Sequence, residues 1–157
     1  NKTSDERRMA LIEEKDRLVS EGRLLRDMAE ALSLESLAGF FEHGLFERLL
    51  KAPKIEREKA FVLKRGSGPD FSMIQGIIDL YFEDEQGLVL VDYKTDRLFG
   101  PEAALIMKQR YSTQLRLYAE ALKRLTGKTP EAAWLYAAHL NQWIDIELTG
   151  KEKEAAF

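Results

Sequence analysis

The sequence predicts an α/β (α+β) fold: a mixed central β-sheet of about five strands, flanked by helices and preceded by a helical N-terminal segment. Helical patterning dominates residues 1–50, and a second, long helical pattern runs from about residue 102 to 125. Strand-like runs lie on either side of that long helix, at residues 54–65, 71–82, 88–96, 132–140 and 143–148. Helices, three strands, a long helix and two more strands, in that order, are typical of such a mixed sheet.

The length and composition indicate one globular domain with a real core. The chain has 157 residues, of which 45% are hydrophobic and 32% are charged. We expect residues 1–53 to form a helical segment that leads into a core formed by residues 54–157. No stretch approaches the ~18 consecutive apolar residues of a membrane span, so no membrane contact is expected.

The residue types exclude several kinds of chemistry. The chain has no cysteine and only two histidines, His43 and His139. This excludes disulfides, thiol catalysis, Cys-ligated zinc, iron–sulfur clusters and a His-rich metal site, and it fits a reducing compartment. The sequence contains neither GxxxxGK[ST] nor GxGxxG, so this segment does not itself bind ATP in a P-loop.

The net charge of −3 bears on the choice of partner. A free-standing, non-specific DNA-binding protein is usually basic. If the substrate is nucleic acid, either other parts of a larger assembly hold it, or the Lys and Arg residues gather on one face.

The N-terminal segment carries several helix start and stop signals. Thr3 and Glu6 form a possible capping box for a helix ending near Gly22. Further helical patterns cover residues 23–32, 34–43 and 45–50, and Pro53 breaks the last of them. At the end of the 34–43 helix, His43 is expected to be a C-terminal histidine favoured by the helix dipole.

A β-hairpin is the central feature of the chain. Two apolar runs, Gln75–Phe82 and Leu88–Asp96, flank a polar turn that ends in Gly87. If the turn is centred between residues 85 and 86, Asp79 lies opposite Asp92, and Lys94 projects to the same face as Asp92. Both strands are apolar on both faces, so each face should be covered and the acidic pair at least partly buried.

This arrangement has two readings. Two opposed carboxylates destabilise a sheet unless they share a proton or hold a cation, and a hard divalent metal resolves the conflict. Lys94 beside such a metal could orient a water or stabilise negative charge on a phosphate. The alternative is a solvated Asp–Lys–Asp cluster without a catalytic role, because an isolated motif of this kind often occurs by chance.

The long helix brings two further polar residues to one face. Gln114 and Tyr118 are four residues apart and therefore neighbours. From spacing alone, Gln114 could be an exposed glutamine and Tyr118 a core tyrosine. The helix stops at Thr126-Gly127, and its apolar stripe is expected to comprise Tyr111, Leu115, Tyr118, Leu122 and Leu125. His139 lies near the turn between the last two strands and is expected to be structural.

Three motifs in order resemble a known family. Gly76-Ile77-Ile78-Asp79-Leu80, Val91-Asp92-Tyr93-Lys94-Thr95-Asp96 and Gln114-Leu115-Arg116-Leu117-Tyr118 are similar to the nuclease motifs of the RecB-like branch of the PD-(D/E)XK superfamily. The similarity is closest to the C-terminal nuclease domains of the AddA subunits of bacterial AddAB helicase–nucleases, throughout residues 71–125. It extends more weakly to Arg57-Glu58 and to Leu135-Tyr136.

The resemblance implies a restriction-endonuclease-like fold and a role for each matching residue. Asp79 and Asp92 would bind Mg²⁺ (or Mn²⁺), with the Tyr93 carbonyl as a possible further ligand. Lys94 would position the attacking water or stabilise the transition state. Gln114 and Tyr118 match a QxxxY motif that helps to hold DNA and the lysine. Thr95 and Asp96 would orient Lys94, and Glu58 is a candidate for an additional carboxylate.

The resemblance also implies a larger assembly. The chain would be a metal-dependent DNA exonuclease domain of an ATP-dependent helicase–nuclease acting in double-strand-break repair. Its partners would be DNA and a second, AddB-type nuclease subunit in a heterodimer, in the bacterial cytoplasm, and ATP would bind only the helicase part. The family's upstream helix with a metal-binding histidine has no match here, and we expect the chain to begin after it. The alternative is therefore a non-catalytic DNA-binding or subunit-docking module on the same fold.

Overall fold

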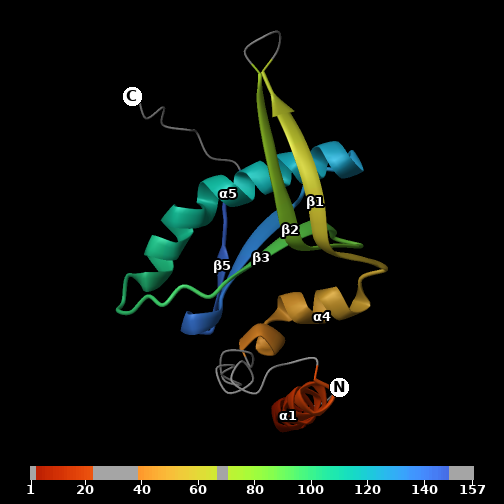
Figure 1. Cartoon of the computed structure of the whole chain (residues 1–157), viewed down its shortest axis with the longest axis vertical. Coiled ribbons are helices and arrows are strands. Elements are labelled where there is room, and N and C mark those ends of the chain that lie inside the picture. Colours follow the sequence, from red (N-terminus) through yellow and green to blue (C-terminus); the bar gives the residue numbers. More distant parts are fainter. Residues whose placement is uncertain (1–2, 23–38, 67–70, 149–157) are drawn as a thin grey trace.

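The computed structural model describes residues 3–22, 39–66 and 71–148 (Figure 1). Expected helices at residues 23–32 and 34–38, and the loop at 67–70, lie outside the described residues. The elements follow the expected order: α1 (Ser4–Ser20), α4 (Gly44–Lys51), β1 (Lys54–Arg65), β2 (Ser72–Asp84), β3 (Gly87–Lys94), α5 (Ala103–Thr126), β4 (Ala132–Ala137), the 3₁₀ helix η1 (Ala138–Leu140) and β5 (Gln142–Asp145).

The strands form one five-stranded mixed sheet in the order β1-β2-β3-β4-β5, which confirms the predicted fold class. All neighbouring strands pair antiparallel except β3 and β4, which are parallel. The long helix α5 makes the connection between these two strands, because a parallel pair cannot be joined by a tight turn. The carboxyl ends of β3 and β4 therefore emerge at the same edge of the sheet (Figure 1).

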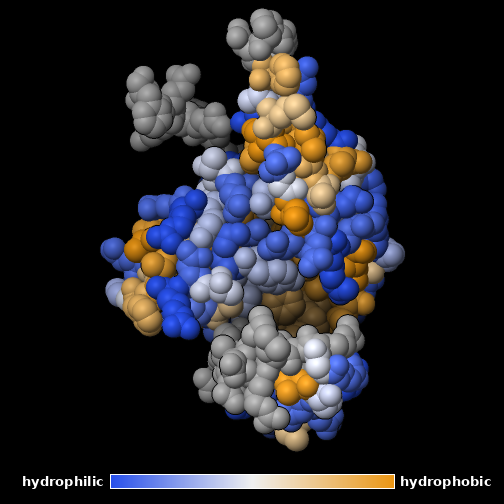
Figure 2. All heavy atoms as spheres, viewed as in Figure 1, coloured by the Kyte–Doolittle hydropathy of each residue, from blue (hydrophilic) through white to orange (hydrophobic). Residues whose placement is uncertain are grey.

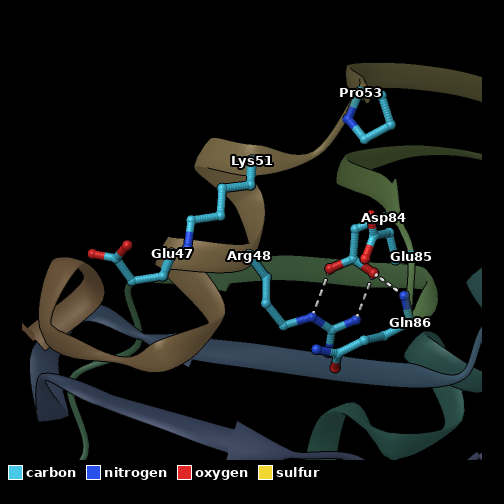
Figure 3. Close-up of a pocket in the computed structure, with 7 residues that line it drawn as sticks. All are labelled: Glu47, Arg48, Lys51, Pro53, Asp84, Glu85 and Gln86. Atoms are coloured by element: carbon cyan, nitrogen blue, oxygen red, sulfur yellow. Dashed lines mark hydrogen bonds and ion pairs between the residues drawn. The ribbon is translucent and has the colours of Figure 1, made fainter.

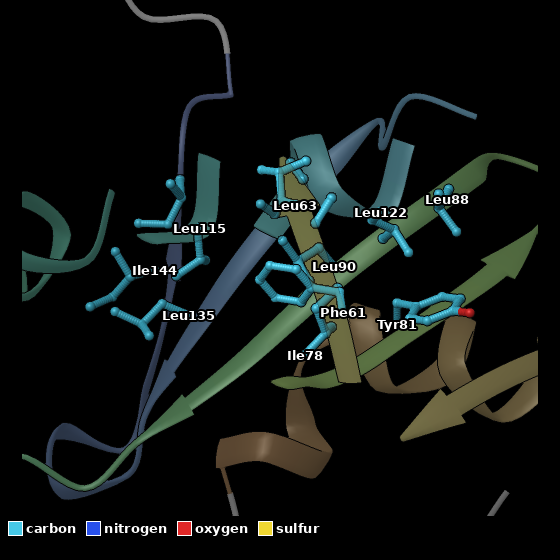
Figure 4. Packing of buried hydrophobic residues seen from close by; sticks show 14 of the residues in the cluster. Phe61, Leu63, Ile78, Tyr81, Leu88, Leu90, Leu115, Leu122, Leu135 and Ile144 are labelled. Carbon is cyan, nitrogen blue, oxygen red and sulfur yellow. The ribbon is translucent and has the colours of Figure 1, made fainter. Parts of the chain in front are cut away.

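Each face of the central strands has its own core. Figure 4 shows the cluster on the α5 side, which includes Leu90 of β3 and Leu115 of the helix. On the opposite face, Phe82 and Val89 pack with Leu45 and Leu49 of α4. The inference that both faces are covered is confirmed, and it explains why β3 is apolar at almost every position.

The distal part of the β1–β2 ribbon, residues 60–65 and 72–77 (the β1–β2 arm), is covered on one face only. Phe61 and Leu63 of β1 are buried toward α5, whereas the intervening Val62 is 63% exposed. Met73 and Ile77 of β2 are exposed as well. Hydrophobic atoms are accordingly visible along this arm in Figure 2. The alternation of buried and exposed residues identifies the arm as a half-covered strand pair.

The turn between β2 and β3 contains two residues, Glu85 and Gln86, as its polar composition predicts. Gly87 has φ 137°, a conformation that favours glycine, and a Cβ there would lie 3.2 Å from Cγ of Glu131. The Asp84 side chain accepts hydrogen bonds from the amides of Gln86 and Gly87, at 2.9 and 3.1 Å.

Helix α4 is attached to this turn by an ion pair. Arg48 donates from Nε and Nη2 to the two Asp84 oxygens, at 2.8 and 3.0 Å, and from Nη2 to Glu131 at 2.8 Å. Figure 3 shows this bidentate contact at the side of a cavity lined also by Glu47, Lys51, Pro53, Glu85 and Gln86. The Arg48 guanidinium, together with the turn amides, lowers the pKa of Asp84 from 3.8 to about 2.

This ion pair should make stability depend on acid. Because the Asp84 pKa is lower in the folded state, its charge stabilises the fold above pH 4 or so, and this contribution is lost as the pH falls toward 2. We expect Asp84→Asn to reduce the free energy of unfolding by about 2 kcal/mol at pH 6 and by almost nothing at pH 2. Urea titrations of the wild type and of Asp84→Asn between pH 2 and pH 6 measure this difference in the free energy of unfolding. A difference that does not change with pH would contradict the prediction.

Some local predictions are confirmed and others are wrong. The Thr3–Glu6 capping box is present, and Gly127 ends α5 with φ 73°. His43 directly follows the helical residues 39–42, as expected, and its Nδ1 also accepts the Leu45 amide at 3.2 Å, so it caps the start of α4 as well. Leu125 is not part of the buried stripe of α5 but is exposed.

The last two strands are shorter than predicted. The strand expected at residues 132–140 ends at Ala137 and continues as η1, and the strand expected at 143–148 is Gln142–Asp145. Asn141 adopts φ 52° between them, a turn conformation that asparagine tolerates. In the part of the chain that the structure describes, no helix is both long and apolar enough to span a membrane.

Candidate active site

The site is built on the carboxyl end of β3. Asp92 is 1% exposed and is the buried charged residue among the described side chains. Lys94, two residues later on the same face, places Nζ 2.6 Å from Asp92 Oδ2. Burial raises the pKa of the Asp92 carboxyl, Lys94 opposes that rise, and the nearby Asp79 adds to it. Such a buried acid, incompletely compensated by its lysine, is typical of functional sites.

Asp79 comes to the same place from β2. Leu80 pairs with Val91 and Asp84 with Gly87, which is the register predicted from the turn. The Asp79 side chain accepts the backbone amide of Tyr93 at 3.0 Å. The structure therefore brings together Asp79, Asp92 and Lys94, and the solvated surface cluster is excluded because Asp92 is buried.

Along β2 the side chains alternate between the two faces of the sheet, and this alternation is interrupted at Asp79. Ile78 packs in the α5-side core and Leu80 in the α4-side core, although side chains two residues apart normally share a face. Directly across, Glu58 of β1 has φ 50°, a strained conformation for a residue with a side chain. Strain of this kind gathers at functional sites. Glu58 lies level with Asp79 but is exposed, and the contacts described do not join it to the acids.

Helix α5 covers the acids with the predicted Gln114 and Tyr118. Gln114 Nε2 donates to the Tyr118 hydroxyl at 3.1 Å. Burial and the negative charge of Asp92 raise the pKa of Tyr118, which places the phenol in the field of the acids. Gln114 Oε1 is buried and accepts no hydrogen bond within the described part of the chain. It remains available as an acceptor inside the site.

Gly76 explains how Tyr118 reaches this position. A Cβ at residue 76 would lie 2.9 Å from the ring of Phe61 and 3.4 Å from Cε1 of Tyr118. The two rings pack edge to face with centroids 5.4 Å apart over this glycine. The glycine of the first motif therefore makes room for the tyrosine of the third, a link that spacing along the sequence could not reveal.

Asp96 acts on the site through Tyr111, a residue that helical spacing alone places in the core stripe. The Tyr111 hydroxyl donates to Asp96 at 2.8 Å, and Arg110 pairs with the same carboxylate at 2.7 Å; both lower the pKa of Asp96. The Tyr111 ring in turn lies 4.8 Å from Lys94 Nζ in a cation–π contact. Thr95 is exposed, and no contact between it and Lys94 is described among these residues.

The donor set fits a hard divalent metal ion. Two carboxylates and a nearby backbone carbonyl are oxygen ligands of the kind that Mg²⁺ and Mn²⁺ accept, and Mg²⁺ needs only one or two carboxylates. The raised pKa of Asp92 shows that its charge lacks full compensation. No cluster of three or more His, Asp or Glu side chains suited to a metal occurs in the described ranges.

Comparisons with known proteins point to one family of nucleases. The family model of the PD-(D/E)XK nuclease superfamily matches residues 3–155. A protein of Alkaliphilus metalliredigens is 33% identical over 139 residues, and one of Anoxybacillus flavithermus is 36% identical over 129; each alignment covers 82% of this chain. A Thermoanaerobacter sp. relative is 36% identical over 124 residues, or 72% of the chain. All three are named as subunits of an ATP-dependent helicase/nuclease.

The relatives are much longer than this chain, which covers only 10–12% of their length. With the family model matching nearly end to end and these relatives above 30% identity, the chain belongs to the PD-(D/E)XK nuclease superfamily.

Proposed function

We propose that this domain hydrolyses phosphodiester bonds of DNA with the help of a divalent metal ion, Mg²⁺ or Mn²⁺. The observation that carries the proposal is the buried Asp92 beside Lys94 and Asp79 at one end of the sheet. A structural ion pair would not need a second carboxylate, whereas a phosphoryl-transfer site needs acids for a cation and a positive group for the phosphate.

Each residue has a distinct part in this proposal. Asp79 and Asp92, with the Tyr93 carbonyl, would hold the metal, which when bound neutralises their charge and polarises a phosphoryl oxygen. Lys94 keeps a positive charge where negative charge develops on the phosphate, and can orient the attacking water. Tyr111 and Asp96 restrict the lysine, while Gln114 and Tyr118 close the site from the helix side. Thr95 and Glu58 are assigned no contact with the substrate.

The relatives' names support a place in a larger machine. We propose that the domain is the nuclease part of an ATP-dependent helicase–nuclease, acting as an exonuclease on unwound DNA during double-strand-break repair. ATP would bind to the helicase part, and an AddB-type protein would be the partner. In such an assembly other domains also hold the DNA, which is compatible with this chain's net charge of −3.

The test is Asp92→Asn in the full-length protein. Mg²⁺-dependent degradation of single-stranded DNA should fall by at least about a hundredfold, because the substitution removes a charged oxygen ligand while keeping the shape of the side chain. Asp145→Asn is the matched control, since Asp145 is an exposed acid on β5 and should leave the rate unchanged. Calorimetry with Mn²⁺ should show binding to the wild type that Asp79→Asn abolishes.

Undiminished cleavage by Asp92→Asn would overturn the assignment. A wild type that binds DNA, takes up no metal and cleaves nothing would instead identify the alternative, a non-catalytic module on the same fold.

A further inference from the structure

Phe99 is the most exposed large hydrophobic side chain among the described residues, at 78%. It lies on the loop between β3 and α5, next to Leu98, which packs against the α5-side core. Arg97 and Phe99 are exposed and Leu98 is half-buried, so the two exposed side chains lie on the solvent side of an anchored loop. Because Leu98 anchors the loop to the core, the Phe99 side chain is directed toward solvent.

His139 supports the Phe99 ring. The two ring centroids are 4.8 Å apart with an interplanar angle of 83°, an edge-to-face contact. His139 is exposed too, and it belongs to η1, which follows β4 directly. In a perpendicular pair, one ring offers only its edge to the other, so flat aromatic surface remains open to solvent.

The aromatic pair lies at the same edge of the sheet as the acidic site. Lys94 pairs with Ala137 where the parallel strands β3 and β4 end. Phe99 comes five residues after Lys94, and His139 comes two residues after Ala137. Figure 1 shows the loop after β3 and the turn after β4 leaving the sheet at one end.

An exposed arginine, Arg97, lies on the same loop as Phe99. Arg97 is exposed, and within the described part of the chain it has no ion-pair partner, in contrast to Arg110 on the neighbouring helix, which is bound to Asp96. An open aromatic face with an exposed guanidinium two residues away along the same loop is a combination suited to single-stranded nucleic acid, where bases stack and phosphates pair. In a duplex the faces of the bases are already occupied by stacking.

We propose that Phe99, supported by His139, is a stacking platform for an unpaired DNA base beside the cleavage site, with Arg97 holding an adjacent phosphate. The inference rests on the proposed function in taking unwound DNA as the substrate, and it adds the place on the chain where an unpaired base would stack. Phe99 and His139 position the strand and take no part in the chemistry.

The experiment measures binding without cleavage. Fluorescence anisotropy with the 157-residue chain, in EDTA at low salt, compares a labelled dT12 with an abasic 12-mer of the same backbone. Phe99→Ala should raise the Kd for dT12 by roughly five- to a hundredfold and leave the Kd for the abasic strand unchanged, because only a base can stack. Phe99→Trp should retain the affinity for dT12.

Phe71→Ala is the matched control. Phe71 is also an exposed phenylalanine, at 45%, but it lies at the far end of the β1–β2 arm, eight residues before Asp79 and thus up to about 26 Å from it. It should not change either Kd. His139→Ala should weaken dT12 binding less than Phe99→Ala, since it removes the support and not the platform.

Three results would each overturn the platform: Phe99→Ala weakens binding of dT12 and of the abasic strand equally, Phe99→Ala weakens binding of neither, or the wild type does not bind dT12. The cleavage assay of Asp92→Asn is independent of this result. If that variant cleaves normally while Phe99→Ala still loses dT12 selectively, the catalytic assignment falls and the stacking platform stands.

Discussion

Lys94→Met is expected to reduce DNA cleavage by about a thousandfold, equivalent to about 4 kcal/mol of transition-state stabilisation. Methionine keeps most of the length of the side chain and can still contact the Tyr111 ring, so the substitution removes mainly the charge. The rate of Mg²⁺-dependent degradation of single-stranded DNA by the full-length protein measures it. Lys108→Met is the control, because Lys108 pairs with Glu147 at the surface of α5, 3.5 Å away.

The same substitution should separate the metal from the lysine. Removing a positive charge 2.6 Å from Asp92 relieves a competitor for the carboxylate, so Mn²⁺ should bind Lys94→Met at least as tightly as the wild type. Loss of cleavage with retained metal binding would support a role for Lys94 in the chemical step. Parallel loss of both would show instead that the lysine only preserves the shape of the site.

Lys94 should matter for folding too. Without it, Asp92 is a buried carboxylate whose partner has been removed, an arrangement that typically destabilises a protein by about 3–5 kcal/mol. The double substitution Asp92→Asn with Lys94→Met removes both charges, so it should recover most of this stability and none of the activity. A double variant as unstable as Lys94→Met would contradict the electrostatic account.

The hairpin could be predicted in detail because its information is local. A short polar turn before Gly87 fixes the register, and the register alone places Asp79 level with Asp92. Apolar residues on both faces of β3 predicted burial of that pair, and the structure confirms it for Asp92. The sequence motifs of the hairpin therefore suffice to predict that Asp79, Asp92 and Lys94 lie together, without information on how the helices pack.

The rest depends on contacts between elements that are distant in sequence. The interruption of the alternation at Asp79 coincides with the unusual φ of Glu58 on another strand, which no period-2 pattern reveals. Tyr111 has the spacing of a core residue, and only the packing of α5 on the sheet brings its ring to Lys94. Leu125 fits the same stripe, yet it is exposed near the end of the helix, beyond the last buried residue, Leu122.

Truncation of adjacent residues of β3 should show that the sheet has two separate cores. Leu90→Ala, toward α5, should lower the free energy of unfolding by about 2–5 kcal/mol, and Val89→Ala, toward α4, by roughly 2 kcal/mol. On the β1–β2 arm the same comparison should give a different result: Leu63→Ala should be as severe as Leu90→Ala, whereas Val62→Ala should change stability by less than about 0.5 kcal/mol.

Urea denaturation of the four variants measures this pattern. A neutral Val89→Ala would mean that α4 does not form a core against the sheet; a severe Val62→Ala would mean that another part of the chain covers the arm.

Leu90 is also only two residues from Asp92, so its truncation tests how the site depends on its support. Because the geometry of the acids follows from the register of β3, folded Leu90→Ala molecules should keep most of their cleavage rate at low temperature and lose it along with the fold on warming. Lys94→Met should be inactive at every temperature, which distinguishes a residue that holds the strand from one that acts on the phosphate.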